Sequence, residues 1–482
     1  MTTSTTTNTD TQQLQSGLAC WMDKVLIELD SASRELAPDP VHNLRVAVRR
    51  CRSIAEGLRS IDCDPTWKHM RRAGKELFAA LGGLRDVQVL MDLVQTLGST
   101  GDTATNYLLH FLRAREPELK VKASEALRVF DRKQWKIWAE YLTDRMEKLR
   151  FGPDVFAYLV LSRWHAAFAL HGRALRSGNQ LVFHDLRIAL KKFRYAVENF
   201  LPVLHERWGK DLKKLQDVLG EAHDLDVLWE AAVSSSVLAD TEAFSRWRYR
   251  ILEERQKRIQ TYREVMVGKR SLWRVWRAEL PQGNEVQKAT IAALAALVHS
   301  FKAQPEHAER VARLSVEIYD GLSSCGIFRP SDAMPRLLLQ SAALMHEIGR
   351  TRRKKGHHKI SGRLISKMST PVGWKTSHVY ITALVARYHR GALPQIHHNL
   401  FCELSPENRQ LTRELAAVLR LADSLDRTHS GMINKITVQK TTETLLVHAE
   451  GYSPDNQHAE KVAAARHLLE TTTGLPCIIH RS

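Results

Sequence analysis

The twelve residues VHNLRVAVRRCR at positions 41–52 recur as FHDLRIALKKFR at positions 183–194. On a helix with 100° per residue, the basic side chains of each copy gather on one face and apolar side chains gather on the opposite face. The repeat therefore predicts two related helical halves. The basic faces are His42, Arg45, Arg49 and Arg52 in the first copy and His184, Arg187, Lys191 and Arg194 in the second. The apolar faces are Leu44, Val48, Cys51 and Ala55, and Leu186, Leu190, Phe193 and Val197.

A second element follows each copy of the helix. LGGLRD at positions 81–86 is matched by LGEAHD at positions 219–224. Two repeated elements in the same order indicate that the whole half is duplicated, rather than a single helix.

The two basic faces favour binding of an anionic polymer. Neither face carries a carboxylate, although a helix that needs only solubility more often interleaves both signs of charge. A solvated face remains the simplest interpretation of one such helix. Two copies favour a shared cleft in which guanidinium groups make bidentate contacts with phosphate. His42 and His184 are either phosphate donors or caps of their own helices, and their spacing does not separate these alternatives.

Nucleic acid competes for the same charge. Proteins that bind single strands place aromatic side chains within the basic groove for base stacking, and neither basic face contains an aromatic residue. We find no motif that docks a helix or ribbon into a DNA groove. The faces therefore favour a phosphate polymer without bases over nucleic acid.

The composition agrees with an anionic partner and predicts a cytoplasmic protein. The 482 residues include 71 Lys and Arg against 53 Asp and Glu, a formal net charge of +18, which favours polyanionic partners. The six cysteines lie far apart without metal-ligand spacing, as expected in a reducing compartment. No uninterrupted run of 18 apolar residues is present, so we expect no membrane span.

The hydrophobic pattern along the chain predicts a mainly α protein. A Pro-Gln-Gly-Asn stretch at 281–284 breaks a basic helix and marks the clearest domain boundary. After Gly431 the pattern alternates as in a β-hairpin, followed by an amphipathic helix and a short strand. The expected segments are a disordered N-terminus (1–15), a helical domain (16–280) with halves at about 16–150 and 151–280, a linker (281–287), a second helical domain (288–430) and a small α/β cap (431–482).

The duplicated H-x-x-L-R-x-x-x-(R/K)-(R/K)-x-R helix and the paired L-G-x-x-(R/H)-D element resemble the conserved histidine α-helical domain, CHAD, over about residues 16–280. That family is built from two helical bundles around a basic central cleft and binds inorganic polyphosphate. The resemblance implies this polymer as the partner and the eight residues of the basic faces as its contacts. It also implies association with polyphosphate granules as an expected location.

Four residues of the second domain follow the order of a metal site. His307, the pair His346 and Glu347, and the distant Asp423 resemble the H…HD…D ligands of the HD phosphohydrolase superfamily, with Glu347 in place of aspartate. There the ligands hold a divalent metal that activates water. Imidazole and carboxylate ligands suit Mn, Fe, Zn or Co better than Ca, and Mg is a further candidate. The alternative places His307 on a solvated helix face and pairs Asp423 with Arg420 and Arg427.

A closer resemblance covers the second domain and the cap. The stretches LMHEIG (344–349), GHHKIS (356–361), ARYHR (386–390) and LRLA (419–422) are similar to the C-terminal half of exopolyphosphatase and guanosine pentaphosphate phosphohydrolase proteins. In that family hydrolysis occurs in an N-terminal actin-like region, and no such region is found in residues 1–285.

Two interpretations of the second domain stay open. In the first, it is a binding and dimerisation unit, which would make the protein a homodimer. In the second, it is a metal-dependent phosphohydrolase that acts on polyphosphate or nucleotides and is targeted by the CHAD domain. A second phosphate surface accompanies the first interpretation. It comprises Arg352, Arg353, His357, His358, His389 and Arg390.

Overall fold

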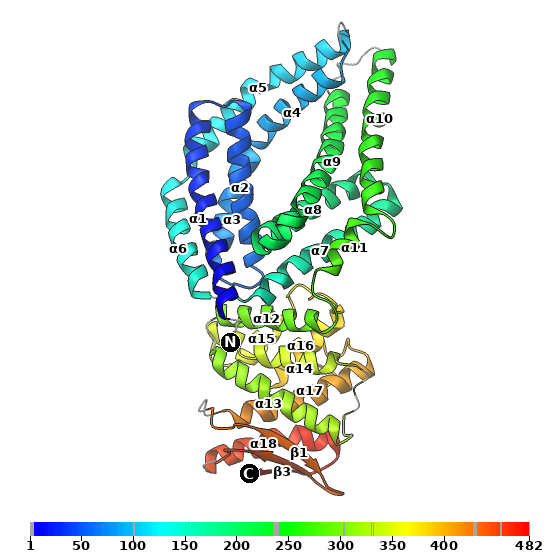
Figure 1. Cartoon of the computed structure of the whole chain (residues 1–482). Helices are drawn as coiled ribbons and strands as arrows, with labels where there is room; N and C mark the ends of the chain where they lie inside the picture. The colour runs from blue at the N-terminus through cyan, green and yellow to red at the C-terminus, as the bar shows by residue number, and fades with distance from the viewer. Residues whose placement is uncertain are drawn as a thin grey trace. The chain divides into compact units, whose positions relative to one another are not determined.

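The computed structural model describes residues 4–99, 102–149, 151–234, 241–301, 304–328, 330, 332–427, 431–453 and 456–481. The chain divides into two compact units, Met1–Gln282 and Gly283–Ser482, and the division falls within the expected linker. Each unit is described by itself. Helices dominate both units, and a small sheet lies at the C-terminal end of the second, which confirms the expected fold class (Figure 1). Within the described residues, none of the helices is long and apolar enough to cross a membrane.

The first unit consists of helices joined by short turns. Its helices are α1 (Ser4–Arg34), α2 (Pro38–Leu58), α3 (Pro65–Ala80), α4 (Gly82–Leu97), α5 (Thr103–Val129), α6 (Arg132–Leu149), α7 (Pro153–Ser177), α8 (Gln180–Phe200), α9 (Pro202–Ser234), α10 (Thr241–Met266) and α11 (Leu272–Ala278). Local chemistry fixes several ends. Asp64 and Asn179 accept hydrogen bonds from the backbone two residues ahead and cap α3 and α8. Gly178 ends α7 in the left-handed region, at φ 61°.

Helix α1 begins at Ser4, inside the segment expected to be disordered. A helix that is already nucleated extends at low cost, because each further residue adds one backbone hydrogen bond. The disorder expected for residues 1–15 stays a prediction.

The two repeated helices, α2 and α8, contact each other, and each turns its predicted apolar face inward. Every residue predicted for those faces is buried, which confirms the assignment. The helices approach closely at Gly57, where an added Cβ would lie 2.6 Å from the ring of Phe200. Lys192 of α8 forms an ion pair with Glu56 of α2 at 2.8 Å, and Arg50 of α2 pairs with Glu198 of α8. The crossing of α2 and α8 fixes where their basic faces lie.

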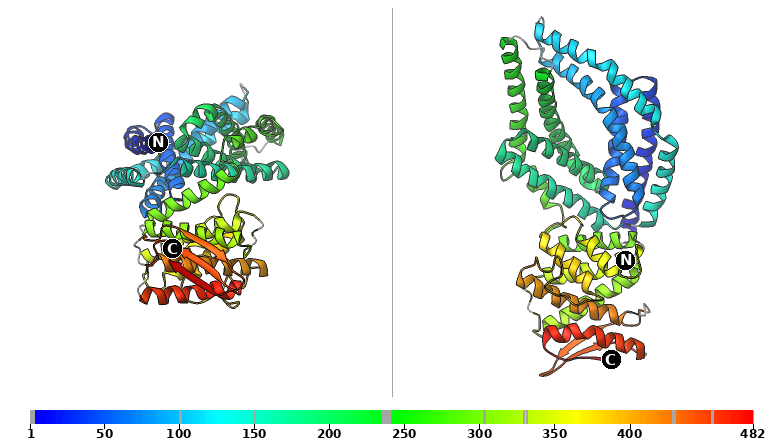
Figure 2. Two further views of the ribbon diagram at one scale, coloured as in Figure 1. Left: turned by 60° about the horizontal axis from the view of Figure 1, so that its bottom comes forward. Right: turned by 180° about the vertical axis from the view of Figure 1, so that it is seen from behind.

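Two helix pairs extend from this crossing. Helices α4 and α5 form one pair and α9 and α10 the other, as Figures 1 and 2 show from three sides. The four helices share one cluster of buried residues, which includes Val94, Leu108, Leu228 and Trp247. This cluster ties the two halves of the unit together at a second place.

The second unit is a helical bundle with a small α/β cap. Its helices are α12 (Asn284–Ser300), α13 (Pro305–Ser324), α14 (Met334–Met345), the 3-10 helix η1 (Ile348–Thr351), α15 (His357–Ile365), α16 (Thr376–Tyr388), α17 (Pro406–Leu425) and α18 (Asn456–Thr473). Its strands are β1 (Ile436–Lys440), β2 (Leu445–Ala449) and β3 (Cys477–Arg481). Strand β2 pairs antiparallel with β1 and parallel with β3, with α18 as the crossover. The expected hairpin, helix and strand are all confirmed.

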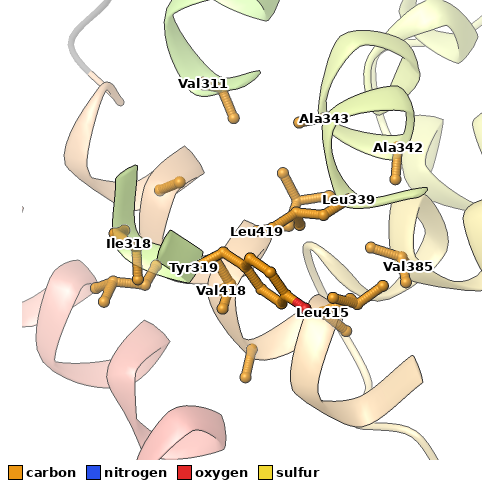
Figure 3. Packing of buried hydrophobic residues seen from close by; sticks show 14 of the residues in the cluster. Val311, Ile318, Tyr319, Leu339, Ala342, Ala343, Val385, Leu415, Val418 and Leu419 are labelled. Atoms are coloured by element: carbon orange, nitrogen blue, oxygen red, sulfur yellow. The ribbon is translucent and has the colours of Figure 1, made fainter. Parts of the chain in front are cut away.

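One continuous core joins the bundle to the sheet. Figure 3 shows Ile318 and Tyr319 of α13, Leu339 of α14 and Leu415 and Val418 of α17 packed together. The inward-facing residues of the strands belong to the same core. Such dense packing holds the ends of α13, α14 and α17 in fixed positions, and those ends carry the chemistry of this unit.

Candidate functional site

Six cations lie on the basic faces of the two repeated helices in the first unit. Arg45, Arg49 and Arg52 come from α2, and Arg187, Lys191 and Arg194 come from α8; we call them the basic cluster. The guanidinium of Arg49 lies 5.5 Å from the ring centre of Tyr195 on the other helix. Lys191 interacts electrostatically with Arg187 of its own helix and with Arg45 and Arg49 of α2. Both halves therefore contribute positive charge to one place.

The basic cluster has no ion-pair partner among the described residues. Its polar contacts are to neutral groups: Arg45 donates to the carbonyl oxygen of Phe78 at 2.8 Å, and Arg194 donates to Oε1 of Gln216 at 3.0 Å. Buried Nε atoms without a hydrogen-bond partner in the described chain belong to Arg49, Arg52, Arg187 and Arg194. The off-face cations of the same helices, Arg50 and Lys192, are paired with glutamates.

The lowered pKa values of Lys191 and Arg45 show that burial disfavours the charged forms of these cations. Burial and the neighbouring charges of Arg187 and Arg49 lower the pKa of Lys191 to about 7. Burial likewise lowers the pKa of Arg45 to about 10, although Asp86 opposes the shift. An anion that entered the cluster would reverse both effects, because an opposite charge favours the charged form of each cation.

The structure excludes the capping role of the two histidines, and their role as phosphate donors stays a prediction. The cap position of α2 is Ala37 and that of α8 is Asn179, so neither His42 nor His184 caps its own helix. Nδ1 of His184 lies 3.2 Å from Nδ1 of His223, which comes from the second repeated element. His42 is exposed. Although this side chain is exposed, partial loss of solvent around its ring lowers the pKa of His42. The positive charge of Arg85, which occupies the position of His223 in the first copy of the second repeated element, lowers it further.

The sequence of the basic faces contains no aromatic residue, but the structure places aromatic rings beside the basic cluster. The ring of Phe78 lies 4.0 Å from the guanidinium of Arg45 and 5.1 Å from that of Arg52. Tyr195 is 4% exposed. These rings lie against the guanidinium groups and hold them by cation–π contact. The sequence could not show this, because Phe78 reaches the cluster from α3.

A second group of residues converges in the second unit. His307 of α13, His346 and Glu347 at the end of α14, and Asp423 of α17 each offer a ligand atom, and these atoms lie within 4.8 Å of one another. All four side chains are buried. We call them the histidine–carboxylate cluster. Oδ1 of Asp423 lies 3.4 Å from Nε2 of His307 and 3.3 Å from Nε2 of His346.

Neighbouring groups fix the orientation of both imidazole rings. Nδ1 of His307 lies 2.7 Å from Oδ2 of Asp426, and Arg310 donates to the same carboxylate at 3.0 Å. Nδ1 of His346 donates to the carbonyl oxygen of Ala343 at 2.6 Å. Both rings therefore turn Nε2 toward Asp423. Sequence reasoning missed Asp426 and Arg310, although Asp426 follows Asp423 by three residues and so lies on the same helix face.

The cluster fits a divalent metal ion. Ligand atoms that bind one ion at about 2.0–2.2 Å lie roughly 3–3.5 Å apart, and the distances of 3.4 and 3.3 Å from Oδ1 of Asp423 to the two imidazole nitrogens fall in this range. The buried Nε2 of His346 has no hydrogen-bond partner in the described part of the chain, even though a carboxylate oxygen is near. Burial opposes ionisation of Asp423, yet the two histidines hold its pKa well below the usual range. Two imidazoles and two carboxylates form a donor set typical of Mn, Fe, Zn or Co.

The structure contradicts the alternative to the metal site and changes the expected phosphate surface. His307 is buried, and Arg420 donates to the carbonyl oxygens of Tyr388 and Gly391 at 3.1 and 2.8 Å. The six residues expected to form a second phosphate surface do not lie on one surface. Arg352 and Arg353 are exposed and His358 is half-buried, whereas His357 and His389 are buried and Arg390 lies 3.4 Å from Asp423.

The burial of His357 follows from a tight turn. The 3-10 helix η1 packs against the start of α15, and Gly349 donates its backbone N–H to the hydroxyl of Ser361 at 2.9 Å. An added Cβ at Gly349 would lie 2.7 Å from the backbone nitrogen of Ser361. The absence of a side chain at Gly349 thus lets α15 begin beside the histidine–carboxylate cluster, with His357 turned inward and the preceding arginines turned outward.

Comparisons with known proteins find a family model that matches part of each unit. A family model of the CHAD domain matches residues 22–233, and a model described as Ppx/GppA phosphatase, domain III, matches residues 286–457; these matched parts are called the CHAD domain and the Ppx/GppA-type domain below. No curated protein matches the chain. Among solved structures, the chain is similar to the crystal structure of the CHAD domain from the plant Ricinus communis. The identity is 21%, the match covers 53% of this chain and 90% of that chain, and the TM-score is 0.42. The protein thus combines a CHAD domain with a Ppx/GppA phosphatase domain III in one chain.

Proposed function

We propose that the CHAD domain binds inorganic polyphosphate through the basic cluster. One observation carries this proposal: Arg45, Arg49, Arg187 and Lys191 come close enough to interact across the two duplicated helices, and no cation of the basic cluster has an ion-pair partner among the described residues. The off-face cations of the same helices are paired with glutamates. Clustered guanidinium groups suit the repeated, closely spaced negative charges of a phosphate chain. His42 and His184 lie on the same faces and would add donors to the chain.

Polyphosphate suits this arrangement better than nucleic acid does. A single strand gains much of its affinity from bases that stack on exposed rings, at about 1–3 kcal/mol per base. Here Tyr195 is almost fully buried, and its ring is covered by Arg49 and Arg50. Tyr195 therefore contacts the cations and offers no open face to a base.

A competition experiment tests the choice of polymer. Labelled long-chain polyphosphate bound to the full chain is titrated with unlabelled polyphosphate or with single-stranded DNA at equal phosphate concentration. Polyphosphate is expected to displace the label at a much lower concentration than DNA. Equal or stronger displacement by DNA would assign the basic cluster to nucleic acid instead.

A second function is favoured by the histidine–carboxylate cluster. We propose that the Ppx/GppA-type domain binds a divalent metal ion through His307, His346, Glu347 and Asp423 and hydrolyses a phosphate ester or anhydride. The observation that favours it is the convergence of four buried donors from three helices, with both imidazole rings oriented by other groups. Exposed acids that meet by chance do not show such support.

The residues around the cluster have separate roles in this proposal. Asp426 and Arg310 hold the ring of His307, and the carbonyl of Ala343 holds that of His346. Arg390 lies 3.4 Å from Asp423 and places a positive charge beside the cluster, where it could neutralise a phosphoryl oxygen. A bound divalent ion would supply Lewis-acid chemistry and activate water.

Metal analysis and a phosphate-release assay test the second function together. The full chain is loaded with Mn²⁺ or Mg²⁺, and metal content and phosphate release from polyphosphate and from nucleotides are measured for the wild type and for Asp423→Asn. Turnover is expected only in the wild type, and Asp423→Asn is expected to bind less metal than the wild type. A wild-type protein with bound metal but no turnover on either substrate class would leave a metal-binding unit and contradict hydrolysis.

A further inference from the structure

A pocket of about 340 Å³ lies where α15 packs against α16 in the second unit. Sites for small molecules have volumes of about 300–1,000 Å³, so this pocket can hold a metabolite. Among the described residues that line it, none belongs to the basic cluster or to the histidine–carboxylate cluster. The functions proposed above therefore make no use of this pocket.

The rim of the pocket is positively charged. Lys359 and Arg363 are exposed and lie one turn apart on α15, and the half-buried Arg387 reaches the pocket from α16. The described lining contains no acidic residue, and none of the three cations has an ion-pair partner among the described residues. Their charge also acts on a neighbour: burial first, and then positive groups that include Arg387 and Lys359, lower the pKa of His398. The described part of the chain therefore does not offset the positive potential of this pocket.

The floor of the pocket, formed by Ala383 and Leu384 of α16, is apolar and buried. An added Cβ at Gly362 of α15 would lie 3.0 Å from the carbonyl oxygen of Ala383, so the two helices meet closely there. Leu400, which is partly buried against the core, adds an apolar wall. The buried side of the pocket is thus apolar, whereas its exposed side carries the charge.

The loop that closes the pocket is held in place. Leu400 has a φ of 64°, in the left-handed region that residues with a side chain seldom adopt. The loop is tied to α16 by a hydrogen bond of 2.8 Å between the hydroxyl of Tyr388 and Nδ1 of His398. The backbone nitrogen of Phe401 donates to the carbonyl oxygen of His398 at 3.1 Å. The pocket is therefore preformed, which reduces the entropy that is lost when a ligand binds.

The combination of a charged rim and an apolar floor selects the class of ligand. Guanidinium and ammonium groups bind phosphate oxygens through charge-assisted hydrogen bonds. An inorganic phosphate chain is charged along its whole length and gains nothing from contact with Leu384 and Leu400, whereas an uncharged ring makes no use of the cations. We propose that this pocket binds a phosphorylated small molecule that carries a flat, largely apolar ring, as a nucleotide does. The phosphate groups contact Lys359, Arg363 and Arg387, and the ring lies on the apolar floor.

Equilibrium dialysis of the full chain with labelled ATP tests this site. EDTA is present throughout, so bound metal and hydrolysis contribute nothing and the result is independent of the proposed phosphohydrolase. Lys359→Ala/Arg363→Ala should weaken the tightest ATP binding by at least about tenfold, because two charge-assisted contacts are lost. Lys354→Ala/Lys355→Ala is the matched control, because these two exposed lysines lie outside the lining, and it should bind ATP as the wild type does.

The ligand class is tested on the wild type alone. Tripolyphosphate supplies phosphate groups without a ring. It should displace the labelled ATP only at a concentration at least about tenfold higher than unlabelled ATP requires, because it cannot bury a ring on the apolar floor. Displacement by tripolyphosphate at the same concentration as by ATP would refute the proposed class of ligand.

A third variant separates the pocket from the basic cluster. Arg45→Ala/Arg187→Ala should retain the tightest ATP binding. Loss of that binding in Arg45→Ala/Arg187→Ala, with retention in Lys359→Ala/Arg363→Ala, would place the nucleotide in the CHAD domain and overturn the inference, while the proposed polyphosphate site would stand. A wild type that binds no ATP would overturn it as well. If circular dichroism shows that Lys359→Ala/Arg363→Ala does not fold, Arg387→Ala tests the same rim.

Discussion

The basic cluster and the histidine–carboxylate cluster each bring chemically similar groups together. They differ in their hydrogen-bond and ion-pair partners: the cations of the first have no ion-pair partner among the described residues, whereas the imidazoles of the second are held by acceptors. In the CHAD domain, Arg49 and Arg187 have no ion-pair partner among the described residues, and burial lowers the pKa of Lys191. In the second unit, His307 and His346 are each held by an acceptor, so that their nitrogen atoms are aimed at one point. The first arrangement is suited to an anion that supplies the missing charge. The second is suited to a cation, because its donor atoms are already oriented toward one point.

The largest expected effect is that of Asp423→Ala, which should abolish phosphate release without changing polyphosphate affinity. Asp423→Ala removes a carboxylate that faces both His307 and His346. Phosphate release should fall by at least roughly a thousandfold, as is common when a central catalytic group is removed. Affinity for polyphosphate, measured by calorimetry on the same preparation, should not change. A parallel loss of polyphosphate affinity would show that the two regions are not independent.

A smaller effect is expected from the support of His307. Asp426→Asn weakens the acceptor that orients the ring, and loss of such a support usually costs about 10–100-fold in metal affinity. The affinity for Mn²⁺ can be measured by competition with a chelating dye. Glu309→Gln is a matched control, because Glu309 also contacts a histidine, His299, at 2.8 Å, but at the surface. Equal effects of the two substitutions would contradict an orienting role for Asp426.

The pH dependence of binding sharpens the account of the basic cluster. The pKa of Lys191 is about 7 in the free protein, so this amine is neutral above pH 7 and charged below it. Polyphosphate in the cluster would favour the charged form of Lys191 and raise its pKa. The contribution of this group to affinity should therefore be nearly constant below pH 7 and fall as the pH rises above 7, by up to about tenfold per pH unit.

A conservative variant isolates the contribution of Lys191. Lys191→Arg keeps the positive charge at high pH and should remove most of the decline between pH 7 and pH 9. The charged neighbours of Lys191 are Arg45, Arg49 and Arg187, which keep their charge over this range, and Asp224, which is an acid. A decline of the same size in Lys191→Arg would assign the pH dependence to another group.

The smallest effect concerns an off-face cation. Lys192→Ala removes an ion pair with Glu56 that is partly exposed to solvent, and such pairs contribute about 0–1 kcal/mol to the free energy of unfolding. Denaturant unfolding should show a change within that range. Polyphosphate affinity should be unchanged, because Lys192 lies off the basic face. A large loss of affinity would show that total charge matters and the position of a cation does not.

Local patterns made much of the fold predictable. The helical period of α2 and α8 separated their buried and basic faces, and alternation after Gly431 indicated the cap. The order of His307, His346, Glu347 and Asp423 also indicated a metal site, because these residues follow a known sequence motif. Each of these signals is carried by neighbouring residues or by their order along the chain.

The errors arose where packing decides the environment of a residue. The segment from Arg352 to His358 contains many basic residues, and the sequence suggested one exposed surface. The turn at Gly349 instead buries His357 and leaves Arg352 exposed. Phe78 reached the basic cluster from another helix. No local pattern reports such contacts, because they depend on how separate helices meet.

Polyphosphate binding is tested most directly by one affinity measurement. Long-chain polyphosphate is titrated calorimetrically into the wild type and into Arg45→Ala/Arg187→Ala, which removes one cation of the basic cluster from each repeated helix. The control is Lys192→Ala, which removes a cation of α8 that lies off the basic face. Two lost charge-assisted contacts should weaken binding by at least about 100-fold, and the control should bind as the wild type does. Equal affinity of the double variant and the wild type would contradict the assignment of the basic cluster as the polyphosphate site.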